Sequence, residues 1–162
     1  MIDFDKIKIF ADGADLLSIR ELAADPRIKG FTTNPTLMRK SGVNDYKNFA
    51  YEVLATVSNR PVSFEVLADD FNEMERQAHI ISSWGDNVNV KIPITNTSGE
   101  LSTSLIRRLS SEQIKLNITA ILTLDRVMVE SGVWHQDQAA TRSTSVTSTP
   151  SLNFTPVITL VK

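Results

Sequence analysis

The chain has 162 residues, of which 41% are hydrophobic and 22% charged, as is usual for one globular domain with a substantial core. Its 17 basic and 19 acidic residues give a net charge of -2 without any basic run, so we expect neither nucleic acid nor a membrane as a partner. The absence of cysteine excludes disulfides, thiolate nucleophiles and cysteine-ligated zinc. The N-terminus is acidic where a signal peptide would be basic, and no apolar run could span a membrane, so we predict a cytoplasmic protein.

The first half of the chain alternates strand-like and helix-like segments. Residues 7–11 predict a strand that ends at a turn, and residues 15–24 carry apolar residues at helical spacing. A second strand over residues 28–31 runs into a Thr-Thr-Asn-Pro-Thr turn, and residues 44–57 predict a second helix.

The second half of the chain repeats this alternation. Strands are predicted over residues 62–66, 88–94 and 116–119. Asp70 and Glu73 form a candidate capping box for a helix that ends near Ser83. Thr97 and Glu100 form a second candidate box, for the helix that carries Leu101 to Leu109. Five strands spaced by one crossover each predict an α/β protein with a parallel sheet or barrel.

The strand over residues 88–94 has one lysine among β-branched residues. Val88, Val90 and Ile92 share one face, whereas Asn89 and Lys91 share the other. If helices cover the apolar face, Lys91 points into the space that the strands enclose, where desolvation favours the neutral, nucleophilic form of an amine. The alternative is a half-exposed strand that leaves the ammonium group in water.

Polar residues recur at the ends of successive strands, and in a parallel sheet or barrel functional groups gather at this edge. The set consists of Asp12, Thr33, Asn34, Glu65, Lys91, Asn117 and Thr119. Each has a purely structural alternative: Asp12 could cap the first helix, Asn34 could build its turn, and Glu65 could face solvent.

Three segments carry a family resemblance: residues 30–37 (GFTTNPTL), 90–93 (VKIP) and 116–121 (LNITAI). In this order and spacing they resemble the transaldolase family, including its fructose-6-phosphate-aldolase-like branch. The resemblance implies a TIM-type (β/α) barrel, a class I aldolase reaction on sugar phosphates in the pentose phosphate pathway, and no metal or organic cofactor.

The resemblance also implies roles for the polar set. Lys91 forms the Schiff base with the ketose, and Asp12 is the acid/base group near the substrate hydroxyls. Glu65 positions a water molecule that moves protons, and Thr119 supports the same water. The transferred dihydroxyacetone unit would be held by Asn34 and Asn117, with Thr33 lining the site.

The family pattern stops after about residue 130. We therefore expect a partial barrel of about five βα units over residues 1–132 and a flexible, Ser/Thr-rich tail outside the family pattern over residues 133–162. The chain resembles a truncated transaldolase, and residues 157–161 have strand propensity. The alternative function is a catalytically inactive barrel remnant, or a binding or assembly module.

Two further expectations concern partners and metals. A sheet of five strands would leave the first and fifth strands with free edges and would expose apolar side chains, so we predict a homo-oligomer. His79 and His135 are far apart in the sequence and lack accompanying ligands, so we expect no metal site.

Overall fold

The computed structural model describes residues 8–13, 15–40, 42–120 and 157–160. Strands and helices alternate through most of this part of the chain. The strands are β1 (Lys8–Gly13), β2 (Ile28–Thr33), β3 (Val62–Glu65), β4 (Val88–Pro93), β5 (Leu116–Thr119) and β6 (Val157–Leu160). The helices are α1 (Leu16–Ala23), α2 (Pro35–Lys40), α3 (Tyr46–Thr56), α4 (Phe71–Ser82) and α5 (Thr103–Ser111). All five predicted strands are confirmed, whereas α2 was not predicted.

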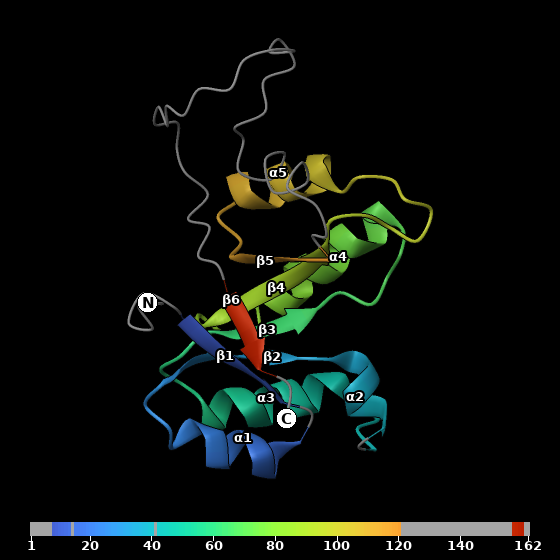
Figure 1. The fold of residues 1–162 in the computed structure, drawn as a ribbon. Helices are drawn as coiled ribbons and strands as arrows, with labels where there is room; N and C mark the ends of the chain where they lie inside the picture. The colour runs from blue at the N-terminus through green and yellow to red at the C-terminus, as the bar shows by residue number, and fades with distance from the viewer. Residues whose placement is uncertain (1–7, 14, 41, 121–156, 161–162) are drawn as a thin grey trace, which may run out of the picture.

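The strands form one parallel sheet in the order β5-β4-β3-β2-β1-β6. The first five strands curl into a half-barrel, as expected for a partial TIM-type barrel (Figure 1). Helices α1 and α3 lie together along the β1 half of the sheet, and α4 and α5 lie along the β4 half. The chain is therefore a run of βα units with helices on the outside.

Strand β6 contradicts one expectation and confirms another. The strand propensity of residues 157–161 is confirmed, because Val157–Leu160 pairs in parallel with β1. The prediction of a free edge on the first strand is therefore wrong. The expected boundary at residue 132 lies outside the described residues.

The apolar core lies between the sheet and the helices. Strand β4 alternates buried and partly buried residues, and Val88, Val90 and Ile92 join the main hydrophobic cluster. The predicted parity of this strand is therefore confirmed. The opposite face of β3, β4 and β5 carries the polar residues Ser63, Glu65, Asn89, Lys91, Asn117 and Thr119. The face of these three strands that lies opposite the helix-covered core is therefore polar around Lys91.

The two predicted caps have different outcomes. The Asp70 carboxylate accepts hydrogen bonds from the backbone N–H groups of Asn72 and Glu73, so the start of α4 is confirmed. The cap at Thr97 is wrong, because α5 begins only at Thr103. The Thr97 hydroxyl and backbone N–H instead donate to Asp69, and these two bonds join the β4–α5 loop to the β3–α4 loop.

Candidate functional site

Strand register brings three of the predicted residues to one level of the sheet. Glu65 on β3 pairs with Lys91 on β4, which in turn pairs with Asn117 on β5. Their side chains share the polar face because residues at equivalent levels of neighbouring strands point the same way. The βα repeats thus place a carboxylate, an amine and an amide side by side.

The amine of Lys91 has two partners. Its Nζ donates to the backbone carbonyl oxygen of Thr33 at 2.9 Å and lies 3.5 Å from Oε2 of Glu65. The side chain of Lys91 is 13% exposed and that of Glu65 is 26% exposed. The alternative of a lysine with its ammonium group in water is therefore wrong, and Glu65 is partly exposed beside that amine.

Asp12 faces the same region from β1. Burial raises the pKa of its carboxyl group, while the positive charge of Lys91 and a hydrogen bond with Thr32 oppose this rise. Its Oδ1 is buried and has no hydrogen-bond partner in the described part of the chain. The alternative that Asp12 caps the first helix is wrong, since Asp15 is the N-cap of α1. A buried carboxyl group with a spare oxygen is suited to exchange a proton with a ligand.

Thr33 ends β2 and Asn34 follows it, but they do not line the site as simply as predicted. The Thr33 side chain is fully buried, and its hydroxyl donates to the carbonyl of Ser63 at 3.0 Å. Only its backbone carbonyl reaches Lys91. The Asn34 side-chain oxygen accepts from the N–H of Thr36, so Asn34 does build its turn.

Asn117 and Thr119 lie on β5, and both are partly buried. The side-chain nitrogen of Asn117 donates to the hydroxyl oxygen of Ser63 at 3.1 Å, which orients its amide. Thr119 pairs with Pro93 and closes the polar face at the β5 edge. Ser63 was not predicted, although its position two residues before Glu65 on the same strand face was a usable signal.

Tyr46 is a second residue that was not predicted. It begins α3, and its hydroxyl contacts the backbone of Glu65. No spacing in the sequence connects a helix start with a strand end 19 residues later.

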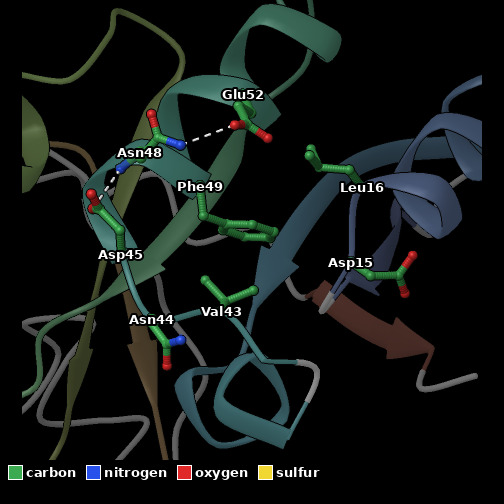
Figure 2. A pocket seen from close by; sticks show the side chains of 8 residues that line it. All are labelled: Asp15, Leu16, Val43, Asn44, Asp45, Asn48, Phe49 and Glu52. Atoms are coloured by element: carbon green, nitrogen blue, oxygen red, sulfur yellow. Dashed lines mark hydrogen bonds between the residues drawn. The ribbon is translucent and has the colours of Figure 1, made fainter.

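A pocket of 280 Å³ lies apart from these residues, between the start of α1 and α3 (Figure 2). Its lining consists of Asp15, Leu16, Val43, Asn44, Asp45, Asn48, Phe49 and Glu52. Two of its carboxylates are helix caps, because Asp15 accepts from Ser18 and Asp45 accepts from Asn48. The acidic lining therefore has a structural explanation, and none of the predicted site residues contributes to it.

One surface cluster of two exposed residues and the partly buried Glu75 combines possible metal ligands. The donor atoms of Glu75, His79 and Glu112 lie within 4.8 Å of one another, where α4 meets the end of α5. The premise that His79 lacks nearby ligand groups is therefore wrong. The Glu75 carboxylate is held by Arg108 through two bonds of 2.9 and 2.8 Å, so it already has a cationic partner.

The described residues contain no helix long and apolar enough to cross a membrane.

Comparison with known proteins gives one family. Residues 9–130 match the family model described as Transaldolase/Fructose-6-phosphate aldolase. A probable transaldolase of Dehalococcoides mccartyi is 35% identical over 123 residues, covering 76% of this chain and 55% of the relative. The corresponding protein of Maridesulfovibrio salexigens is 37% identical over 117 residues, covering 72% and 52%. That of Sphingopyxis alaskensis is 45% identical over 89 residues, covering 55% and 40%.

The chain spans about half the length of the curated relatives that it matches. The matched residues include β1 to β5 almost entirely, and with them Asp12, Glu65, Lys91 and Asn117. The family match thus extends over more than half of the chain and over the polar face around Lys91. The protein therefore belongs to the transaldolase/fructose-6-phosphate aldolase family.

Proposed function

We propose that the chain transfers a dihydroxyacetone unit between sugar phosphates through a Schiff base on Lys91. The observation that carries the proposal is the placement of the Lys91 amine, which is 13% exposed and lies between the Thr33 carbonyl and the Glu65 carboxylate. An amine in this position is largely removed from water, yet the Glu65 carboxylate is close enough to take part in the transfer of the protons that the amine must lose. Family membership and the named relatives support the same chemistry.

The first proposed step is attack of the neutral amine on the C2 carbonyl of a ketose. The carbinolamine that forms loses water, and the nitrogen becomes a protonated iminium. In this proposal Glu65, whose carboxylate lies 3.5 Å from the Lys91 amine, holds the water molecule that carries these protons, and Thr119 supports the same water.

The second proposed step is cleavage of the C3–C4 bond. Asp12 accepts the proton of the C4 hydroxyl, the bonding pair moves to the iminium nitrogen, and an aldehyde leaves. Because burial raises the pKa of Asp12, this carboxyl group is a better base than an exposed aspartate. The enamine that remains attacks an acceptor aldehyde, Asp12 returns the proton, and hydrolysis frees Lys91.

The amide groups provide the proposed binding of the dihydroxyacetone hydroxyls. The nitrogen of Asn117 donates to Ser63, so its carbonyl oxygen is oriented by that bond to accept from a hydroxyl group. Asn34 is assigned to the same unit from the β2 end, with the Thr33 backbone beside it.

The proposal also includes a pathway and a compartment: the exchange would belong to the pentose phosphate pathway in the cytoplasm.

A turnover assay tests the proposal. Purified chain is incubated with fructose 6-phosphate and an aldose phosphate acceptor, and the exchanged sugars are separated and quantified. We expect turnover that Lys91→Met abolishes and that Lys29→Met, a change at an exposed lysine of β2, leaves intact. Absence of turnover in the unaltered chain would favour the alternative of an inactive barrel remnant or assembly module.

A further inference from the structure

The ladder between β2 and β3 stops just below the proposed site. Its paired residues are Phe31 with Val62 and Thr32 with Ser63. In a parallel ladder the next hydrogen bond would run from the N–H of Glu65 to the carbonyl of Thr33. The register ends before this step, so the two groups take other partners.

The Tyr46 hydroxyl is the partner of one of these groups, the N–H of Glu65. It accepts a hydrogen bond from the N–H of Glu65 at 2.8 Å and lies 3.1 Å from the carbonyl oxygen of the same residue. The other group, the carbonyl of Thr33, accepts from Nζ of Lys91 at 2.9 Å. The phenol thus satisfies a backbone donor that would otherwise pair with the carbonyl that holds the lysine.

Tyr46 is itself held firmly in place. Its ring makes edge contacts with Phe64 and Trp84, with centroid distances of 6.1 and 5.5 Å. Burial raises the pKa of the Tyr46 hydroxyl to about 12, so the group stays protonated and keeps both its donor and its acceptor function. The start of α3 is fixed by the Asp45 cap one residue earlier.

We propose that Tyr46 is a positioning residue, whose hydroxyl opens the β2–β3 ladder and thereby frees the Thr33 carbonyl to hold the Lys91 amine. The same contact fixes the backbone of Glu65, whose carboxylate is the second partner of Lys91. Tyr46 contacts neither substrate nor reacting atoms in this scheme. The inference rests on the proposed function for its kinetic consequence, whereas its structural part can be tested alone.

The test compares Tyr46→Phe with Tyr51→Phe, the same change at the only other tyrosine of the chain. Tyr51 lies on the same helix but is 45% exposed. Both changes keep the ring and remove one hydroxyl. In Tyr46→Phe, we expect changes in the NMR chemical shifts of the Lys91 side-chain nitrogen and of the Glu65 amide. The spectra are recorded well below the unfolding temperature. We also expect kcat to fall about tenfold with little change in KM. The reason is the loss of the hydrogen bond that fixes the backbone of Glu65, whose carboxylate faces the Lys91 amine. Tyr51→Phe should change none of these quantities.

The outcomes separate the two proposals. If the unaltered chain shows no turnover, the proposed function fails, and the NMR comparison still decides the role of Tyr46. Unchanged Lys91 and Glu65 signals in Tyr46→Phe would overturn the inference, even if the variant melted at a lower temperature. If Tyr46→Phe does not fold, the unaltered chain decides: a nuclear Overhauser effect between the Tyr46 hydroxyl and Glu65 amide protons supports the contact, and its absence contradicts it.

Discussion

Glu65 and Lys91 stand opposite each other on neighbouring strands, and their charged groups are 3.5 Å apart. Strand register alone produces this pair, because β3 and β4 are joined by a crossover helix that fixes them in parallel. The lysine is tethered from the other side by the Thr33 carbonyl. An amine held between an acceptor that cannot titrate and one that can is suited to a reaction in which it repeatedly gains and loses protons.

Substitutions of Glu65 test whether its carboxylate holds the water that moves protons. Glutamine keeps hydrogen-bonding capacity but not the charge, whereas alanine loses both. We expect kcat to fall about tenfold in Glu65→Gln and about a hundredfold in Glu65→Ala, within the usual range for proton-transfer groups. KM should change little in either variant. Equal losses in both would mean that the charge, and not the water, is what matters. Glu100→Gln, an exposed change in the β4–α5 loop, serves as the control.

The contributions of Asp12 and Asp15 to folding stability should change with pH in opposite directions. Burial raises the pKa of Asp12, so its favourable contribution to stability is present below the pKa of the unfolded chain and is lost as pH rises through the folded value. Hydrogen bonds from Ser18 lower the pKa of Asp15, so its contribution is present above the unfolded value and is lost as pH falls.

Urea unfolding of two asparagine variants measures this contrast. From about pH 3 to about pH 7, the stability of Asp12→Asn relative to the unaltered chain should rise, and that of Asp15→Asn should fall. Asparagine is also a good N-cap, so Asp15→Asn should lose little beyond the charge effect. Parallel pH profiles for the two variants would show that Asp12 is not buried as described.

Gly30 is expected to be a stability determinant of the strand that carries Thr33. A Cβ atom at Gly30 would collide with the ring of Phe10 on β1. Gly30→Ala should therefore destabilise the chain by about 1–3 kcal/mol, as overpacking of a close contact does. Gly85→Ala is the control, because its Cβ would meet no atom closer than 3.4 Å. Equal unfolding midpoints for the two variants would contradict this close packing.

Self-association is predicted from the sheet edges. In the described part of the chain, β5 and β6 each have a neighbour on one side only. Unpaired backbone groups favour edge pairing between copies. Sedimentation velocity over a range of concentrations should show a rising fraction of oligomer. A single monomer peak throughout would contradict this prediction.

Much of this fold could be predicted from sequence because its signals are local. Alternating Val and Ile residues around Lys91 set the orientation of β4, and Asp70 marked the start of α4. The same local reasoning failed at Thr97, where a capping pattern was present but the side chain found Asp69 in another loop. Local patterns predict a hydrogen bond only where no better partner is brought in by the tertiary fold.

The residues of the candidate site also fall into those that sequence signals indicated and those that depend on tertiary contacts. Strand parity indicated Lys91, whereas positions near the ends of predicted strands and the family resemblance indicated Asp12 and Glu65. Tyr46 and Ser63 were missed, since their roles depend on which hydroxyl meets which backbone or amide group across the fold. The partner of Lys91 on β2 is a backbone carbonyl. Every residue type has this group, so no sequence motif could indicate it.

Reductive trapping of the Schiff base tests the proposed role of Lys91 most directly. The chain is incubated with dihydroxyacetone and borohydride, digested, and mapped by mass spectrometry. We expect one predominant adduct, on Lys91, that is absent from Lys91→Met and unchanged in Lys29→Met. Modification spread evenly over the exposed lysines, with Lys91 no more labelled than Lys29, would contradict this role.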